Sequence, residues 1–216
     1  METFGQNAPS AHQPGPIALS RPRTPAREKI APQGSGAGRV RIIGGEWRSR
    51  RIAVADSPGL RPTPDRIRET VFNWLGQRLD GYRCLDLFAG SGVLGLEALS
   101  RGAVSATLVE RSRDVAANLA RNATALGATG AEIVIADALE FLAQTGRQGA
   151  YDLAFIDPPF SAGLHEPVLK LLPAVLAPGG RAYLESSEQG VPPGWVAEKE
   201  GRAGKVHFYL IRREPA

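Results

Sequence analysis

The sequence of 216 residues predicts an α/β fold, in which helices cover both faces of a mainly parallel sheet. From residue 79 onward, short apolar segments of strand length alternate with segments of helical periodicity. The strand segments are apolar almost throughout, as in strands that are buried on both faces. The last two strand segments are joined by a glycine-containing turn, which predicts an antiparallel hairpin at one edge.

The chain before this region differs in composition. Residues 1–38 contain six prolines and five glycines without apolar periodicity, which predicts a disordered tail. Residues 39–68 hold eight arginines and three acidic residues, whereas the whole chain has a net charge of +4. Such a basic cluster favours contact with a polyanion, most often nucleic acid, over a merely solvated face. We therefore expect a tail (1–38), a basic N-terminal segment (39–78) and a main domain (79–216).

The basic segment predicts a small β-hairpin followed by a helix. Strands are expected over 40–45 and 50–55, with glycines ending the first one. Thr63 or Asp65 is expected to cap the helix. The apolar residues of the helix recur at helical spacing: Ile67, Val71, Phe72 and Leu75.

The main domain is interpreted as five strand-then-helix units followed by the edge hairpin over 194–213. Its expected strands cover residues 82–88, 106–110, 131–137, 151–157 and 181–186. Its expected helices cover residues 93–102, 113–127, 138–144 and 167–180, and the last one ends in a turn.

The single cysteine, Cys84, lies in an apolar run and is expected in the core. One cysteine excludes an intrachain disulfide and a multi-cysteine metal site, and it fits a reducing cytoplasm. The three histidines lack the spacing of metal ligands, so no metal is expected. The sequence has no run of about 18 apolar residues and no secretory signal, so we expect a cytoplasmic protein, with a monomer as the default.

Four of the expected strands end in an acidic residue: Asp86, Glu110, Asp137 and Asp157. The carboxyl ends of parallel strands meet at one edge of a sheet, where ligands bind. Each acid alone could simply cap the helix that follows it. Four acids at the same edge instead favour a binding site.

Gly90, Gly92 and Gly95 have the G-x-G-x-x-G spacing of a dinucleotide-binding loop, and Glu110 follows Gly90 by twenty residues. In an NAD site this loop would hold a pyrophosphate, and the acidic edge would repel that anion. S-adenosylmethionine has no phosphate and carries an ammonium and a sulfonium, which carboxylates stabilise. Glu110 could then accept the ribose hydroxyl groups, and Asp137 the adenine amino group. The charge therefore favours S-adenosylmethionine over NAD.

The tetrapeptide D-P-P-F, residues 157–160, follows the fourth expected strand. Prolines donate no backbone hydrogen bond, so the stiff turn leaves the Asp157 carboxylate and the Pro158 carbonyl as acceptors. Two adjacent acceptors suit an exocyclic NH2 group, whose nitrogen becomes a better nucleophile when both hydrogens are accepted. Phe160 offers a face for stacking of a base, worth about 1–3 kcal/mol. A plain turn is the alternative, but the position favours methyl transfer with Asp157 as proton acceptor.

The segments DLFAGSGVLGLEALSRGA, VE at 109–110, DALEFL and DPPF resemble class I S-adenosylmethionine-dependent methyltransferases acting on exocyclic amino groups. RIIGGEWRSRRI, SPGLRPTPDRIRETVFNWL and GKVHFYL are similar to the RsmD family of bacterial 16S ribosomal RNA guanine-N2 methyltransferases. The resemblance covers about Arg39 to Arg212. It implies a Rossmann-like fold with a seven-stranded sheet and S-adenosylmethionine as cofactor. The implied substrate is a guanine of 16S rRNA in an assembled or partly assembled small ribosomal subunit.

The expected site residues fall into three groups. The guanine is expected at Asp157, Pro158, Pro159 and Phe160. The cofactor is expected at Asp86, Phe88, Ala89, Gly90, Ser91, Gly92, Gly95, Glu110, Arg111, Asp137 and Ala138. RNA contacts are expected at Arg41, Arg48, Arg50, Arg51, Arg61, Arg66 and Arg68. Trp47 and Trp74 could stack on RNA, although core packing is favoured for both.

Three alternatives stay open. The same chemistry could serve adenine or cytosine in DNA, although the chain has no room for a large target-recognition domain. An NAD-dependent oxidoreductase is disfavoured by the acidic edge. A non-catalytic RNA-binding assembly protein could retain the fold, but it would have no need of an intact D-P-P-F.

Overall fold

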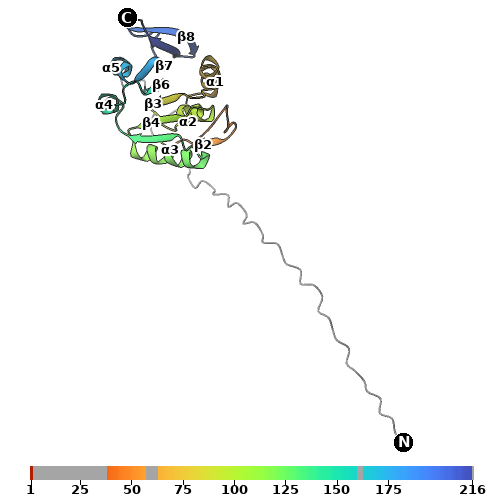
Figure 1. The fold of residues 1–216 in the computed structure, drawn as a ribbon. Coiled ribbons are helices and arrows are strands. Elements are labelled where there is room, and N and C mark those ends of the chain that lie inside the picture. Colours follow the sequence, from red (N-terminus) through yellow and green to blue (C-terminus); the bar gives the residue numbers. More distant parts are fainter. Residues whose placement is uncertain (2–37, 57–62, 160–162, 216) are drawn as a thin grey trace. The chain divides into compact units, whose positions relative to one another are not determined.

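The structure is a computed structural model of the chain, and it describes residues 1, 38–56, 63–159 and 163–215 (Figure 1). Nearly all of the expected tail lies outside the described residues, and so do two predicted site residues, Arg61 and Phe160. A seven-stranded sheet with helices on both faces forms the main part of what is described.

The sheet has the strand order β5-β4-β3-β6-β7-β9-β8. Neighbouring strands from β5 to β7 are parallel, β9 is antiparallel to β7, and β8 is antiparallel to β9. The predicted mainly parallel sheet with an antiparallel hairpin at one edge is therefore confirmed. The strands are β3 (Arg83–Asp86), β4 (Ser105–Glu110), β5 (Ala131–Ile135), β6 (Tyr151–Ile156), β7 (Leu176–Ser186), β8 (Trp195–Ala203) and β9 (Val206–Arg213).

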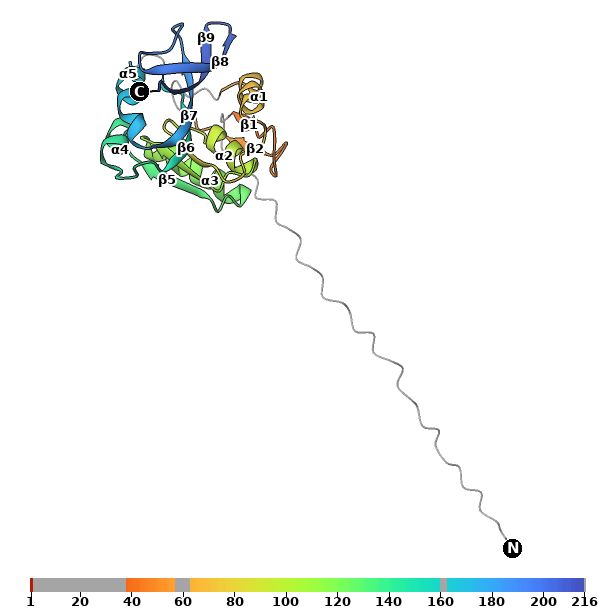
Figure 2. The ribbon, with the colours of Figure 1, turned by 45° about the horizontal axis from the view of Figure 1, so that its top comes forward.

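Two separate apolar clusters lie on the two faces of the sheet. Figure 2 shows α4 and α5 on one side of the sheet and α1 and α2 on the other. Residues of α1, α2 and α3 pack in one cluster, and residues of α4 and α5 pack in the other. Alternation along β3 divides its side chains, because Cys84 lies in the first cluster and Leu85 in the second. Cys84 is fully buried, as its sequence context predicted. The helices are α1 (Asp65–Trp74), α2 (Val93–Ser100), α3 (Arg113–Leu126), α4 (Ala138–Gln144), α5 (His165–Leu171) and the 3-10 helix η2 (Leu172–Ala174).

The basic segment begins with two short antiparallel strands, β1 (Arg39–Arg41) and β2 (Arg51–Ala53), which form the predicted hairpin. The middle residue of each strand is buried in the first apolar cluster. The side chain of Asn122 on α3 accepts from the Ala53 amide at 3.0 Å and donates to its carbonyl at 2.8 Å. These bonds attach β2 to α3, so the hairpin packs against the main domain.

Helix α1 starts without a side-chain cap, so the prediction that Thr63 or Asp65 caps it is wrong. Pro64 is the N-cap residue, and the Thr63 hydroxyl bonds to a different part of the chain. A proline is tolerated there because the first N–H groups of a helix lack helical partners. The predicted apolar residues of the helix are all buried: Ile67, Val71, Phe72 and Leu75.

The segment before β7 departs from the prediction of a helix over 167–180 that ends in a turn. Helix α5 and η2 stop sooner, and β7 already begins at Leu176. Pairing with β6 then shifts in register, and residues 177–180 form an irregularity inside the strand, where Pro178 lacks an N–H and Gly179 has φ +75°. The strand continues into the β8–β9 hairpin, so the fifth expected strand-then-helix unit has no helix.

Candidate active site

The strand order reverses between β3 and β6, because β3 is followed outward by β4 and β5 whereas β6 is followed by β7. In open α/β sheets, ligands bind at such a switch point. Asp86 is the last residue of β3, and Asp157 directly follows β6. Because the two strands are adjacent and parallel, both acidic residues lie at the same edge of the sheet.

The glycine-rich loop connects β3 to α2. Gly92 is the N-cap of α2 and has φ +81°, in the left-handed region that favours glycine. A Cβ at Gly92 would collide with Leu119 of α3, and one at Gly95 would collide with Leu108 of β4. These two glycines therefore let α2 pack closely on the neighbouring helix and on the sheet, which is a role beyond the expected close approach to a ligand.

Asp86 is buried beneath this loop. Its Oδ2 accepts a hydrogen bond from the Gly95 amide at 3.1 Å. Burial, and to a smaller extent the negative charge of Glu110, raises the pKa of Asp86 to about 7, although backbone hydrogen bonds oppose the shift. Among the described residues, no cationic side chain forms an ion pair with Asp86. The site therefore contains a buried carboxyl group that lacks a cationic partner.

Glu110 ends β4, and two backbone amides orient its carboxylate. Its Oε2 accepts from the Gly90 amide at 3.0 Å, and its Oε1 accepts from the Ser112 amide at 2.7 Å. A carboxylate oxygen can accept more than one hydrogen bond, so each oxygen keeps acceptor capacity for a further donor. The other predicted cofactor contacts of this region are the half-buried Phe88, the buried Ala89 and Ser91, and the exposed Arg111.

Asp137 follows β5 and is the N-cap of α4. Its Oδ1 accepts from the amides of Leu139 at 2.9 Å and Glu140 at 3.4 Å. The helix-capping alternative therefore applies to this residue. Its Oδ2 forms no hydrogen bond within the described part of the chain, so one oxygen is available for a ligand. The next residue, Ala138, is buried at the start of the helix.

Asp157 is held by a residue from the N-terminal segment. The Thr63 hydroxyl donates to Asp157 Oδ2 at 2.9 Å, which leaves Oδ1 for other contacts. Enclosure of the carboxyl group, together with the nearby charge of Glu185, raises the pKa of Asp157 well above its ordinary value. Of the two prolines that follow, Pro158 is buried and Pro159 is exposed.

Glu185 lies at the same edge, near the end of β7, and was not predicted as a site residue. The register of β6 and β7 places Asp157 and Glu185 at neighbouring positions of adjacent parallel strands. The Tyr183 hydroxyl donates to Glu185 Oε2 at 2.7 Å, and His165 Nε2 lies 2.7 Å from the Glu185 carbonyl oxygen. Burial raises the pKa of Glu185. Asp157 and Glu185 thus form a pair of enclosed carboxyl groups.

The predicted RNA contacts separate into exposed and internal arginines. Arg41, which is exposed, forms an ion pair with Asp65 at 3.1 Å. Arg50 donates to the carbonyl groups of Ala125 and Leu126, at the C-terminal end of α3, where a cation is favourable. The other exposed predicted contacts are Arg48, Arg51 and Arg66.

Arg68 is fully buried, so its prediction as an RNA contact is wrong. Its guanidinium donates to the Thr63 carbonyl at 3.1 Å and to Glu97 Oε2 at 3.0 Å, and it also bonds Asp65. Burial lowers the pKa of Arg68, and the two carboxylates oppose this shift. The sequence places Arg68 among other arginines, so its burial could not be expected without the partners that the tertiary structure supplies, above all Glu97 on α2.

That partner, Glu97, is also fully buried. Its carboxylate accepts from the amides of Ile43 at 2.9 Å and Gly44 at 2.7 Å, and it pairs with Arg101 at 2.9 Å. The resulting Arg68–Glu97 cluster comprises Asp65, Arg68, Glu97 and Arg101. It joins the hairpin, α1 and α2 through charged groups that are paired inside the protein.

The two tryptophans pack within the protein. Trp47 is buried in the first apolar cluster, which confirms the favoured core role. Trp74 is half-buried and stacks on Phe208, with ring centroids 5.3 Å apart.

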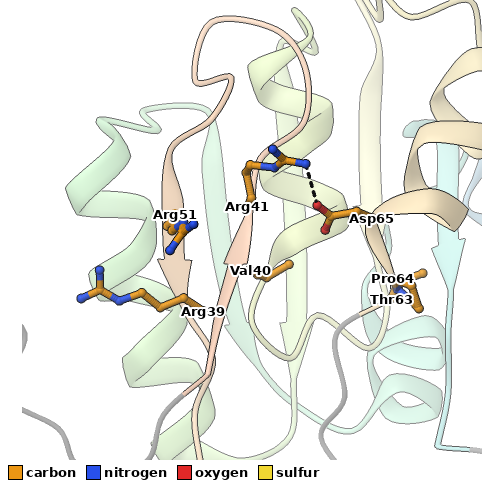
Figure 3. Close-up of a pocket in the computed structure, with 7 residues that line it drawn as sticks. All are labelled: Arg39, Val40, Arg41, Arg51, Thr63, Pro64 and Asp65. Atoms are coloured by element: carbon orange, nitrogen blue, oxygen red, sulfur yellow. Dashed lines mark hydrogen bonds and ion pairs between the residues drawn. The ribbon is translucent and has the colours of Figure 1, made fainter.

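A cavity of about 440 Å3 lies between the hairpin and the start of α1 (Figure 3). Thr63 belongs to its wall and also bonds Asp157, so the cavity adjoins the end of β6. The residues that line it are Arg39, Val40, Arg41, Arg51, Thr63, Pro64 and Asp65.

In the described residues, no group of three or more His, Cys, Asp or Glu side chains is placed to hold a metal ion. None of the described helices has the length and apolar character needed to cross a membrane.

A protein-family model described as "Conserved hypothetical protein 95" matches residues 40–212. "Ribosomal RNA small subunit methyltransferase D" of Escherichia coli (strain K12) is 49% identical over 189 residues, which cover 85% of this chain and 94% of that protein. The protein of the same name from Haemophilus influenzae is 42% identical over 182 residues, with 81% and 94% covered. The solved structure "Putative methyltransferase yhhF from Escherichia coli" has a TM-score of 0.73 and 44% identity, and the match covers 82% of this chain and 99% of that one.

Proposed function

The chain belongs to the RsmD family of ribosomal RNA methyltransferases, and from this premise we propose a specific reaction. The protein transfers a methyl group from S-adenosylmethionine to the exocyclic N2 amino group of a guanine. The guanine lies in 16S rRNA of the small ribosomal subunit. One observation carries the proposal: Asp86 and Asp157, two carboxyl groups without a cationic partner among the described residues, meet at the switch point of the sheet.

The cofactor assignment rests on the donors and acceptors along β3, β4 and β5. S-adenosylmethionine supplies an electrophilic methyl group on a sulfonium, and it also carries an ammonium. Asp86 offers these cations a buried carboxylate, and a buried carboxylate is stabilised by an opposite charge. Glu110 offers spare acceptor capacity to two ribose hydroxyl groups, and Asp137 Oδ2 is available to an amino group of the base. A pyrophosphate beside Asp86 would be repelled, which disfavours NAD.

The guanine assignment rests on the end of β6. Thr63 fixes one oxygen of Asp157 and leaves Oδ1 free, and the Pro158 carbonyl follows directly in the chain. Together these two acceptors suit the two hydrogens of an exocyclic amino group. The amino nitrogen gains a methyl group and loses one proton, and Asp157 is the candidate acceptor of that proton. Its raised pKa matches this role better than that of an ordinary carboxylate.

The names of the relatives and the enclosed carboxyl groups favour this reaction over the alternatives. The relatives from Escherichia coli and Haemophilus influenzae are named for the RNA of the small ribosomal subunit, whereas nothing in the described residues resembles a separate DNA-recognition domain. The enclosed Asp157–Glu185 pair has no evident use in a protein that only binds RNA, because buried carboxyl groups without cations cost stability.

Methyl transfer from labelled S-adenosylmethionine to four substrates tests the proposal. The substrates are unmethylated small ribosomal subunits, naked 16S rRNA, large subunits and duplex DNA, and the labelled product is digested to nucleosides. We expect N2-methylguanosine from the small subunit. Label only on DNA would overturn the substrate but keep the chemistry. No label on any substrate, with cofactor binding intact, would favour the non-catalytic alternative.

A further inference from the structure

Three arginine side chains share one face of the β1–β2 hairpin, and all three line the cavity (Figure 3). Arg39 and Arg41 are two residues apart on β1, so they project from the same side. Arg51 is the direct cross-strand partner of Arg41. The other side of the hairpin is buried in the core, which fixes the direction of the exposed face. Regular backbone pairing therefore places the three side chains on one face of the hairpin, where Arg41 reaches toward Asp65 and Arg39 extends away from it (Figure 3).

This face has an excess of positive charge. Of the described residues that line the cavity, Asp65 alone is acidic. It pairs with Arg41, and it also bonds the buried Arg68, so one carboxylate serves two arginines. Neither Arg39 nor Arg51 forms an ion pair within the described ranges of the chain. The guanidinium fork matches the oxygens of a phosphate group better than an ammonium does.

The arrangement is unfavourable for the protein alone. Like charges at directly opposed positions of an antiparallel pair, such as Arg41 and Arg51, are destabilising. An anion that lies between the side chains removes this repulsion. Exposed charges that cost stability are typical of binding surfaces, where function opposes stability.

Thr63 connects the cavity to the site of reaction. It is buried, its carbonyl accepts from Arg68, and its hydroxyl donates to Asp157. The same residue thus forms a wall of the cavity and positions the candidate proton acceptor. A polynucleotide whose base reaches Asp157 has its backbone close to this wall.

We propose that the cavity is a phosphate subsite, in which Arg39, Arg41 and Arg51 hold a phosphodiester group of the RNA strand next to the reacting guanine. This assignment presupposes the proposed rRNA reaction and adds the place where the strand is held. It gives Arg39, which sequence patterns did not single out, a role in substrate binding. It also separates the hairpin arginines by task, because Arg50 bonds α3 whereas these three face the cavity.

The test compares the double variant Arg39→Gln/Arg51→Gln with the wild type on unmethylated small ribosomal subunits. We expect KM to rise about tenfold to hundredfold and kcat to change little, because charge-assisted contacts with the substrate backbone are lost. The slope of log affinity against log salt should fall by about one to two units. The control variant Arg202→Gln/Arg213→Gln removes two exposed charges from the β8–β9 hairpin, and it should leave KM and the slope unchanged.

Thermal unfolding distinguishes a role of these arginines in RNA binding from a role in stability. Because Arg51 opposes Arg41, the change Arg51→Gln should leave Tm unchanged or raise it while it weakens RNA binding. A lowered Tm together with unchanged KM would overturn the proposal. The variant Arg39→Lys/Arg51→Lys keeps both charges, so it should retain the salt slope while losing part of the affinity.

Two further results would overturn the subsite without touching the proposed reaction. Unchanged KM and salt slope in the Gln double variant, with normal transfer by the wild type, would exclude a phosphate in the cavity. Weakened action on assembled subunits with normal binding of naked 16S rRNA would assign the cavity to an acidic protein surface instead. Absence of transfer by the wild-type protein itself would refute the proposed function, and binding of naked rRNA by the same variants would then test the subsite alone.

Discussion

In the described part of the chain, two regions enclose charged groups, and they differ in whether those groups have charged partners. In the Arg68–Glu97 cluster, the buried carboxylate of Glu97 faces two arginines and two backbone amides. At the edge of the sheet, Asp86, Asp157 and Glu185 are enclosed without a cationic partner among the described residues. Their donors are neutral: the Gly95 amide, the Thr63 hydroxyl and the Tyr183 hydroxyl.

This contrast distinguishes buried charges that are structural from buried charges that serve a ligand. A paired buried ion is complete within the protein, so the pKa of Arg68 is lowered by burial while its two carboxylates hold it in place. The edge carboxyl groups have raised pKa values, because burial disfavours their charged form and neutral hydrogen-bond donors offset this only in part. A cationic cofactor, and a nucleobase whose amino group donates hydrogen bonds, would supply the partners that these carboxyl groups lack.

Asp157→Asn should have the largest effect, because it removes the candidate proton acceptor while keeping the shape of the side chain. We expect methyl transfer to fall by about 100- to 10,000-fold. The free energy of unfolding should stay the same or rise, since an enclosed carboxyl group without a cation is removed. Single-turnover transfer and urea unfolding measure the two quantities. Asp80→Asn, at an exposed position, is the control, and full transfer by Asp157→Asn would refute the role of this carboxylate.

Glu97→Gln should destabilise the Arg68–Glu97 cluster. It removes the buried charge that pairs with both Arg68 and Arg101, so we expect a loss of about 3–5 kcal/mol in the free energy of unfolding. Urea denaturation measures this loss. The matched control is Glu166→Gln, which breaks an exposed pair with Lys170 and should cost far less, because exposed ion pairs contribute little to stability. Equal losses for the two variants would show that the cluster is not structural.

Cofactor affinity should depend on pH through Asp86. The raised folded pKa means that the free protein holds a proton that the unfolded chain releases, so the contribution of Asp86 to stability falls as pH rises from about 4 to about 7. A cationic ligand favours the ionised form, so binding should release a proton, and affinity should rise with pH and level off above about 7. Calorimetry in buffers of different ionisation enthalpy measures the released proton. Asp86→Asn should abolish the release, and an unchanged release in that variant would assign the proton to another group.

Glu185→Gln should give the smallest effect, a shift of the pH dependence of transfer. The charge of Glu185 helps to raise the pKa of Asp157, so its removal lowers that pKa. The acid limb of the kcat/KM profile should therefore move to lower pH, with the maximum rate largely preserved. Glu188→Gln, at an exposed position shortly after the end of β7, should leave the pH profile unchanged. A shift to higher pH would contradict the coupling of the two carboxyl groups.

The fold was predictable because its signals are local. Apolar strands, helical periodicity and the glycine-containing turn of the edge hairpin specify the parallel sheet and the antiparallel edge strands. The extent of β7 was not predictable, since the A-P-G-G turn signal proved to lie inside a strand whose pairing with β6 continues on both sides.

The candidate site was predictable as far as strand ends are visible in the sequence. The rule that selected four acidic strand ends would also have selected Glu185, because the strand expected over 181–186 carries an acid near its end. Thr63 gave no comparable signal, since its contact with Asp157 joins residues 94 positions apart. The burial of Arg68 was hidden for the same reason, because its partner Glu97 lies 29 residues away on another helix. Composition reports charge, whereas only the tertiary structure reports which charges are already paired.

The hydrogen bonds that Glu97 accepts from the hairpin bear on how the chain folds during its synthesis. The amide of Ile43 is bonded by a carboxylate 54 residues further along, so the hairpin cannot complete its hydrogen bonds until α2 has been made. Non-local contacts of this kind form only after the intervening chain has been brought together. The hairpin is therefore completed only after the chain has been made as far as α2. Until then, its arginines remain an uncovered basic stretch beside the very class of nucleic acid that its family modifies.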